Sequence, residues 1–367
     1  MKVQDKKIGE VFDFIGEENL TEENCYNRLG IYPVYSGQTE NDGMVSNVNF
    51  FKEKEPCLTF TSYGSAGKLS FREGKFTIGR NCMGLRPKAE FKDKINIKWF
   101  LYTNNKLFIK NRKGDKDGQG LLNKTILENV KFQLPEDITY QNKISETYDK
   151  LFFIKDALNK IIININSLLI RPFYFGEKEH IKEISVKEIF DLISGNSGLT
   201  EEYIYTSVQN KDRPITFLGG SLNEEIIKIP LMSHPKKDGK IDYLDNREGI
   251  LVVRKGKAGT IRYLSKGKYA TNDDAYLLTL KKEYQDKIEL KWITYEYKDL
   301  FLKYSSSSDN GTWNKGRFFN EAKIKIIPLK YQEKIVAYYD RLNELKKYLL
   351  DILKKIEFLV DKDFHID

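Results

Sequence analysis

Apolar residues recur in a heptad pattern along two separate stretches of the chain. In each stretch they follow alternating steps of four and three residues, which is the spacing of a coiled-coil seam. The first seam comprises Ile144, Tyr148, Leu151, Leu158, Ile162, Ile165 and Leu169, and the second comprises Ile335, Tyr339, Leu342, Leu349, Leu353, Ile356 and Val360. Each residue of the second seam lies 191 positions after its counterpart, and a lysine, Lys155 or Lys346, interrupts both seams at the same heptad position. The pattern predicts two long helices with matching registers.

The matching registers favour a structure in which the two helices pack on each other. The alternative is that each seam packs on the domain to which it is attached, as in an ordinary amphipathic helix. Each seam is narrow, however, and would fit a partner of the same kind. A helix of about 35 residues is about 50 Å long, which is long enough to hold two globular bodies apart.

The stretch of chain before each seam has a different pattern. Short runs of β-branched and aromatic residues alternate there with turn residues, and few long helical patterns occur. We therefore predict an α+β fold with two tandem, mixed, β-rich bodies, each followed by a long helix, and the two helices packed on each other as a coiled coil. The predicted boundaries are 1–135 and 176–327 for the bodies, and 136–175 and 328–367 for the helices.

Further matches between the two halves of the chain support a domain duplication. IGEVFDFI at 8–15 resembles VKEIFDLI at 186–193, and the basic hairpin at 67–87 resembles the one at 259–279. IKWF at 97–100 matches LKWI at 290–293, residues 118–135 resemble 314–329, and YDKL at 148–151 matches YDRL at 339–342. The matches occur in the same order in both halves, so each body should have the same fold.

The net charge of +8 and the pI near 8.9 are compatible with a polyanionic partner, although lysine-rich surfaces also occur for solubility alone. Residues 1–135 hold 22 basic and 17 acidic residues, and residues 181–327 hold 25 and 21. The basic excess therefore lies in the bodies, so if the chain contacts phosphates, the bodies should make those contacts. The alternative is a small excess of charge spread over solvated surfaces.

Glycines, hydroxyl side chains and basic side chains stand together in TSYGSAGKLSF at 61–71 and VVRKGKAGTIRY at 252–263. Glycine permits close approach of the backbone to a surface, and these side chains are the usual phosphate contacts. Lys68, Lys255, Lys257 and Arg262 are the predicted phosphate contacts. The further predicted DNA-binding residues are Thr61, Ser62, Tyr63, Ser65, Arg112, Lys113, Arg254, Lys315 and Arg317.

Side chains that can recognise base edges lie in neighbouring turns. Arginine can pair with guanine, asparagine and glutamine with adenine, and aspartate with cytosine. The predicted base contacts are Gln38, Asn41, Arg80 and Asn81 in the first body, and Thr271, Asn272, Asp273 and Asp274 in the second. Polar turns are also required by any β-rich domain, so the alternative is that these residues are structural. The two bodies differ most in these loops, as expected if they recognise different sequences.

The sequence contains few features of an enzyme. No phosphate-binding loop ending in GK[ST] occurs, and no Asn/Asp-Pro-Pro-aromatic tetrapeptide of adenine methyltransferases. The three histidines stand apart without metal-ligand spacing. Asp273 and Asp274 could suggest a metal-dependent nuclease, but we match them to Asn81 and Cys82, which form no acidic pair. We predict no catalytic residue, no metal site and no cofactor in this chain.

The N-terminal residues are polar and do not resemble a signal peptide, and the longest apolar run, at 161–170, is too short to span a membrane. The cysteines are three in number and lack metal spacing, so we expect free thiols in a reducing cytoplasm.

The whole chain resembles the specificity subunit of a type I restriction-modification system. The resemblance lies in the order body, helix, body, helix and in the phrases YPVYSGQTENDG, GSAGKLSFREGKFTIGRNCMGLRP and PEDITYQNKISETYDKL. IPLKYQEKIVAYYDRL is similar to the start of the second helix in that family, except that Tyr338 and Tyr339 replace the usual aliphatic residue before Asp340.

The resemblance implies that each body is a target recognition domain for one half of a split DNA target. It also implies that the two helices pack as an antiparallel coiled coil, which sets the spacer. It also implies partners: two methyltransferase subunits that carry S-adenosylmethionine and modify adenine, and motor-nuclease subunits. The alternatives are a specificity subunit of a type IIB or phage-exclusion system, a nuclease or methyltransferase with DNA-binding domains, and a scaffold that binds no nucleic acid.

Overall fold

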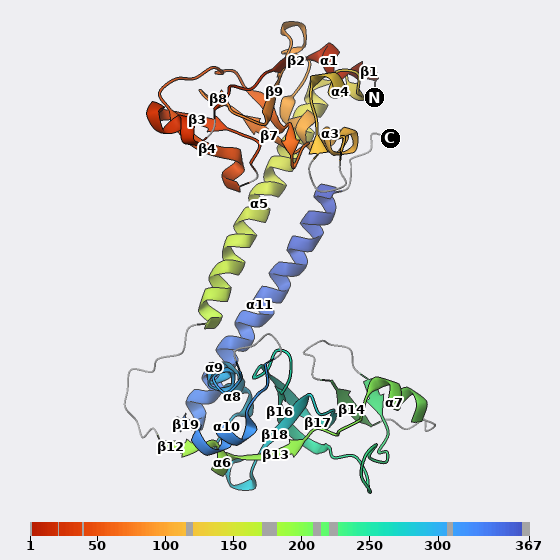
Figure 1. Cartoon of the computed structure of the whole chain (residues 1–367), viewed down its shortest axis with the longest axis vertical. Helices are drawn as coiled ribbons and strands as arrows, with labels where there is room; N and C mark the ends of the chain where they lie inside the picture. The colour runs from red at the N-terminus through yellow and green to blue at the C-terminus, as the bar shows by residue number, and fades with distance from the viewer. Residues whose placement is uncertain are drawn as a thin grey trace. The chain divides into compact units, whose positions relative to one another are not determined.

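The computed structural model describes residues 2–20, 22–38, 40–114, 120–170, 182–207, 214–219, 227–306 and 311–361. The chain divides into two compact units. The first unit consists of Met1–Ile161 and Leu350–Asp367, and the second consists of Ile162–Leu349. Each unit therefore contains one globular body and a part of both long helices (Figure 1).

The first body contains two main sheets. Its strands are β1 (Val3–Lys7), β2 (Phe12–Ile15), β3 (Leu29–Tyr35), β4 (Met44–Val48), β5 (Cys57–Thr61), β6 (Tyr63–Gly64), β7 (Leu69–Arg72), β8 (Thr77–Ile78), β9 (Cys82–Pro87), β10 (Gly120–Leu121) and β11 (Lys131–Pro135). An antiparallel sheet has the order β2-β9-β5-β7, and a smaller sheet, β4-β3-β8, contains the parallel pair β3 and β8. β1 pairs with β11, and β6 pairs with β10.

A helix covers the antiparallel sheet of the first body. The helices here are α1 (Ile8–Val11), α2 (Glu22–Cys25), α3 (Ile97–Asn111) and α4 (Lys124–Leu127), with the 3₁₀ turns η1 (Tyr26–Arg28), η2 (Glu40–Gly43) and η3 (Ala89–Phe91). Trp99, Phe100 and Phe108 of α3 form one buried cluster with strand residues such as Phe60 and Leu85. Burial of these apolar surfaces stabilises the contact between helix and sheet.

The second body has a single six-stranded sheet. Its strands are β12 (Lys182–Ser185), β13 (Phe190–Ser194), β14 (Ile215–Leu218), β15 (Ile227–Ile229), β16 (Leu244–Val253), β17 (Ile261–Thr271), β18 (Ala275–Leu280) and β19 (Lys323–Ile326). The sheet has the order β13-β18-β16-β17-β14-β15, and β12 pairs separately with β19. The helices of this body are α6 (Val186–Ile189), α7 (Glu201–Ser207), α8 (Leu290–Glu296), α9 (Lys298–Leu302) and α10 (Lys315–Glu321), with the 3₁₀ turn η5 (Lys282–Tyr284).

The two bodies repeat one topology, which confirms the predicted duplication. The order β2-β9-β5-β7 in the first corresponds to β13-β18-β16-β17 in the second. In both, the next pairing is parallel, between β3 and β8 and between β14 and β17. The 11-residue β17 therefore occupies the places of both β7 and β8, which are separate strands in the first body.

The long helices are α5 (Ile138–Ile170) and α11 (Leu329–Asp361), each of 33 residues. Within the first unit, Lys155 of α5 forms an ion pair with Glu357 of α11, with 3.1 Å between Nζ and Oε1. Within the second unit, Leu169 of α5 packs against the apolar cluster that contains Ile335 and Tyr339 of α11. A later residue of α5 thus meets an earlier part of α11, so the two helices run antiparallel.

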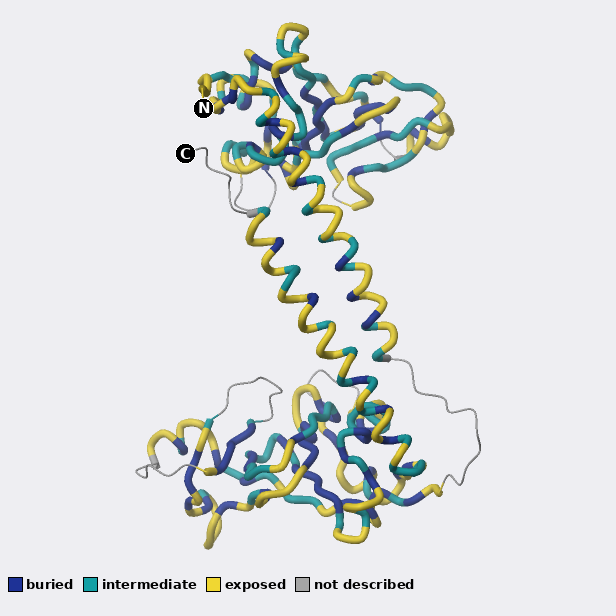
Figure 2. The backbone as a smooth tube through the Cα atoms, turned by 180° about the vertical axis from the view of Figure 1, so that it is seen from behind, coloured by how far each residue is buried: buried dark blue, intermediate teal, exposed yellow. Residues whose placement is uncertain are grey.

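All fourteen residues of the two predicted seams are buried or half-buried. Figure 2 shows these buried positions spaced along both helices between exposed ones. The two interrupting lysines, Lys155 and Lys346, are half-buried as well. A lysine can lie at such a position because its apolar stem packs on the seam while its ammonium group stays in water or pairs with an acid.

A buried glutamine attaches each long helix to its own body. The side-chain N–H groups of Gln141 donate to the carbonyls of Lys94, at 3.0 Å, and Pro135, at 2.8 Å, and its oxygen accepts from the backbone N–H of Asn96 at 2.8 Å. The same amide therefore links the start of α5 to β11 and to the turn before α3.

Gln332 makes the equivalent three bonds in the second unit. It donates to the carbonyls of Lys287, at 3.0 Å, and Ile327, at 2.7 Å, and accepts from the backbone N–H of Glu289 at 2.8 Å. Both glutamines are fully buried. Because a buried backbone group without a partner is costly, these amides hold the helix and body in one arrangement.

An aspartate about two turns further along each helix strengthens the attachment. Asp149 accepts from Lys98, at 3.0 Å, and from the hydroxyl of Tyr102. In the second unit, Asp340 accepts from Lys291, at 2.7 Å, and from the hydroxyl of Tyr295. The repeated phrases that end in YDKL and YDRL are thus explained by contacts between helix and body.

No helix within the described part of the chain is long and apolar enough to cross a membrane. All three cysteines, Cys25, Cys57 and Cys82, are buried and belong to no disulfide.

Candidate nucleic-acid interface

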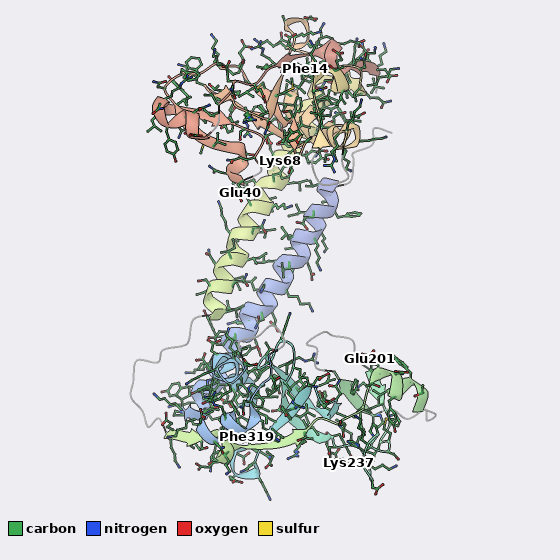
Figure 3. The ribbon with its side chains drawn as sticks, viewed as in Figure 1. Phe14, Glu40, Lys68, Glu201, Lys237 and Phe319 are labelled. Atoms are coloured by element: carbon green, nitrogen blue, oxygen red, sulfur yellow. The ribbon has the colours of Figure 1, made fainter. Side chains whose placement is uncertain are left out.

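The predicted DNA-binding segments of the first body lie next to one another. The backbone N–H of Gly37 donates to Arg80 at 3.1 Å, and that of Ser62 donates to Asn81 at 2.9 Å. The backbone N–H of Leu122 donates to the carbonyl of Ser62 at 2.8 Å, and Leu121 of β10 forms a β-bridge with Lys113. Four segments that are distant in sequence therefore form one edge of the body, and Figure 3 places Lys68 on the same side as Glu40.

Most of the predicted side chains on this edge are available to a ligand. The exposed ones are Gln38, Asn41, Tyr63, Ser65, Lys68, Arg80 and Lys113, and the half-buried ones are Ser62, Asn81 and Arg112. Thr61 does not belong to the surface, because it is the last residue of β5 and only 5% exposed. Its side chain is packed within the sheet, so we remove it from the predicted contacts.

The glycines of the two basic hairpins have two different roles. Gly67 has φ of 96°, and an added Cβ would lie 3.1 Å from the backbone of Ile109 in α3. Gly259 has φ of 81°, and its Cβ would lie 2.9 Å from the carbonyl of Phe301 in α9. These two glycines allow the turn to pack on a helix of its own body, not on a ligand as the sequence predicted.

Gly64 and Gly256 are different. Both have positive φ, and nothing lies within 4 Å of the place where a Cβ would be. Their backbone is therefore open at the Cβ position, and a lysine, Lys68 or Lys257, follows each of them in the hairpin. They remain the positions of the hairpin where a phosphate could approach the main chain.

The base-contact turns of the two bodies correspond with a shift of one residue from the predicted alignment. Cys82 pairs with Thr61, and Ala275 pairs with Val253 in the same place. Arg80 and Asn81 therefore correspond to Asp273 and Asp274. The first body presents a cation and an amide where the second presents two carboxylates, which is a reversal of charge at the same place in the fold.

The carboxylates of the second body are paired with basic side chains of the same body. Lys255 lies 3.0 Å from Asp274 and 3.3 Å from Asp273, and these bonds raise the pKa of the lysine. Arg254 donates to the backbone carbonyl of Asp273 at 3.0 Å. Asn272 adds a bond to the backbone N–H of Asp274 at 3.2 Å. The turn is a small ion-paired network, not a bare acidic pair.

The other predicted residues of the second body have varied surroundings. Lys257 is exposed, and Arg262 lies half-buried on β17. Thr271 is only 1% exposed at the end of β17, so it is excluded from the surface for the same reason as Thr61. Lys315 and Arg317 are exposed at the start of α10, where Arg317 forms a forked pair with Glu321 at 3.1 and 3.2 Å. The pair uses two of the five N–H donors of the guanidinium, so Arg317 is oriented by Glu321 and keeps donors on its other nitrogen.

The sequence analysis missed Arg72, which is buried at the end of β7 and contacts the turn that contains Asn41. Charged residues are rarely buried, so an arginine in a strand is normally expected on the surface. A weak signal was present in the alternation of residues 69–72, which places Arg72 on the opposite face from Phe71.

No group of three or more metal-binding side chains occurs among the described residues. The site therefore consists of amide, hydroxyl, guanidinium, ammonium and carboxylate groups on turns. These groups suit hydrogen bonding to base edges and phosphates.

Comparison with known proteins agrees with this arrangement. A family model described as "Type I restriction modification DNA specificity domain" matches residues 1–167 and again residues 178–357. Two proteins of Mycoplasma pneumoniae that are named as type I specificity subunits match shorter stretches. S.MpnORF507P is 32% identical over 88 residues, and S.MpnORF201P is 33% identical over 69 residues. The chain spans about a quarter of the length of these relatives, 24% of the first and 29% of the second. The matches cover 24% and 19% of this chain.

Solved structures share the fold over nearly the whole chain. The S subunit of a type I restriction-modification system from M. genitalium has a TM-score of 0.64 at 15% identity, covering 98% of this chain and 94% of its own. A chain from a structure of type I R-M complex assembly and conformational transition has a TM-score of 0.55 at 12% identity, covering 99% and 97%. At such identities the likeness concerns the fold.

Proposed function

Because this chain belongs to the type I restriction modification DNA specificity domain family, we propose that it is the DNA-recognition subunit of a type I restriction-modification complex. Each body recognises one half of a bipartite double-stranded target. The observation that carries this proposal is the duplicated body with unlike polar turns at the same place. A scaffold that both bodies share, with Arg80 and Asn81 in one copy and Asp273 and Asp274 in the other, suits two different base sequences.

The basic side chains next to these turns supply the phosphate contacts. Lys68 and Lys113 are exposed beside the base-contact turns of the first body, and Lys257 is exposed beside those of the second. Phosphate contacts fix the register of a protein on the duplex, whereas the base-contact turns determine which DNA sequence is recognised. Binding should therefore weaken at raised salt concentration in the same way for target and non-target DNA.

The chain itself is non-catalytic in this proposal. Two methyltransferase subunits bind it, hold the S-adenosylmethionine and modify adenine, and restriction motor-nuclease subunits complete the complex. The duplication supports this stoichiometry, because two copies of one fold present two similar surfaces to two copies of one partner. The complex acts in the cytoplasm, where the DNA is.

The antiparallel pair of α5 and α11 sets the spacer between the two half-targets. The support is the narrow apolar seam that the two helices share and the buried attachment of each helix to its own body. To set a spacer, the helix pair must be stiff and each helix must be fixed to its own body. The shared seam supplies the stiffness, and the glutamine bonds supply the attachment.

The test is to co-express the chain with the methyltransferase gene that neighbours its own and to map methylated adenines across the host genome. We expect a split motif with a fixed gap that disappears when this chain is omitted. Methylation that persists unchanged without the chain would refute the proposal. Cleavage on both sides of the motif would instead assign the chain to a type IIB system.

A further inference from the structure

The turn between β3 and β4 is closed at its base and strained at its tip. The backbone N–H of Ser36 donates to the carbonyl of Gly43 at 2.8 Å, so the two ends meet. Asn41 and Asp42 have φ of 46° and 50°, which places two consecutive non-glycine residues in the left-handed region. Such a conformation persists only where the surrounding structure holds it.

Arg72 is the side chain that holds the tip. It is only 6% exposed, and its guanidinium donates to both the carboxylate and the backbone carbonyl of Asp42. Its Nε donates to the hydroxyl of Thr59 at 3.1 Å, and its Cζ atom lies 3.8 Å from the ring centre of Tyr35. A guanidinium has a rigid fork of donors, so these contacts fix the direction of Asp42 and of the residues beside it.

The groups that the turn presents outward are polar. Gln38, Glu40 and Asn41 are all exposed. The side-chain N–H groups of Gln38 and Asn41 donate to the carbonyl of Met44, at 2.7 and 3.4 Å. An amide has two N–H donors and an acceptor oxygen, so one bond to Met44 orients each amide without using its whole capacity.

We propose that Gln38 and the turn Glu40–Gly43 form a preorganised base-reading element of the first body, and that Arg72 is the positioning residue that holds it. This inference rests on the proposed function. An amide that is already oriented loses less conformational entropy on binding, and discriminates more sharply between bases, than one on a flexible loop.

The second body has no arginine at the position of Arg72, and most of its turn between β14 and β15 lies outside the described residues. Cys57 pairs with Arg72 across β5 and β7, and Gly249 pairs with Leu264 in the corresponding place. Leu264 is buried in an apolar cluster and carries no charge. The arginine is therefore a feature of one copy, which indicates a role in what that copy recognises and not in the common fold.

The experiment compares the methylation motifs of three full-length variants, each co-expressed with the neighbouring methyltransferase. Arg72→Leu introduces the residue of the second body, Gln38→Ala removes an exposed amide, and Glu73→Gln is the control, an exposed change next to Arg72. For each variant, the fraction methylated is measured at sites that differ by one base in either half of the motif.

We expect Arg72→Leu and Gln38→Ala to lose about tenfold or more in discrimination at one or two bases of a single half-target. The other half and the spacer stay unchanged, and Glu73→Gln behaves as wild type. A purely structural defect in Arg72→Leu would lower methylation at all sites alike, without changing which bases are accepted. Gln38→Ala removes an exposed side chain whose bond to Met44 is local to the turn, so its effect should be confined to the half-target that the first body recognises.

The inference is overturned if both variants keep the wild-type motif, or if both halves relax together. If the wild-type chain itself directs no split motif, the proposed function fails, and the two failures are thereby separated.

Discussion

Cys57 and Cys82 lie in one apolar cluster of the first body, and burial raises the pKa of each thiol to about 12. The reactive form of cysteine is the thiolate, which is then a very small fraction at pH 8. We predict that the native chain reacts with a thiol-specific chromogenic reagent at least about a hundredfold more slowly than an unfolded one. The measurement is the rate of colour formation at pH 8 with and without denaturant.

A Ser65→Cys variant supplies the control, because residue 65 is exposed in the hairpin turn. It should add one rapidly reacting thiol to the native protein. Rapid reaction of the wild-type chain under native conditions would show that the first body opens readily, which contradicts the packing described above.

The sequence predicted which polar residues lie close together better than it predicted which of them are exposed. The grouping of Lys68, Arg80 and Asn81 follows from residue type and turn spacing, and these residues do share an edge. The burial of Thr61 and Thr271 could not be predicted, because it depends on which distant strands pair with β5 and β17. Arg72 was missed for the same reason, since its partner Asp42 lies 30 residues away in the chain.

At the scale of elements, Gln141 and Gln332 make the most specific prediction. Each satisfies three backbone groups at the junction of a body and its helix. Gln141→Ala and Gln332→Ala should each lower the midpoint of thermal unfolding of the full chain by about 5–10 °C, because buried N–H and C=O groups lose their partners. Circular dichroism at 222 nm measures this midpoint.

Glu146→Ala, an exposed change on the same helix, is the matched control and should leave the midpoint within about 1–2 °C of wild type. An equal effect of the control and the glutamine variants would mean that the junction contributes nothing beyond helix propensity.

The long helices could be predicted well because a heptad seam is local in sequence and needs no knowledge of the rest of the fold. The sheets could be predicted only as β-rich bodies. The parallel pairings of β3 with β8 and β14 with β17 join segments more than 40 residues apart, and no periodicity in the sequence encodes such a pairing. The 15-residue α3 was also not expected, since its pattern is interrupted by polar residues.

At the scale of the whole molecule, the role of the helix pair in setting the spacer can be tested by changing the length of the two helices. Deleting residues 155–161 and 351–357 removes one heptad from each helix at the level where Lys155 meets Glu357, and keeps the phase of both seams. Seven residues at 1.5 Å correspond to about three base pairs at 3.4 Å. We predict that the gap in the methylated motif shortens by about three base pairs, or that the complex fails to assemble.

A variant that keeps the length but changes exposed side chains, such as Lys160→Ala with Lys354→Ala, should keep the wild-type gap. A shortened chain that assembles and still methylates at the original gap would refute the role of the helices as a ruler.

The repeated junction has a consequence for how such a chain can change over generations. The two long helices attach to their bodies through equivalent contacts. Gln141 and Asp149 make them on one helix, and Gln332 and Asp340 make them on the other. A recombination event that exchanged one body for another would therefore keep these junction contacts while it replaced the polar turns of that body. If the proposed function holds, exchange of a whole body would then change the DNA target without disturbing the junction between body and helix.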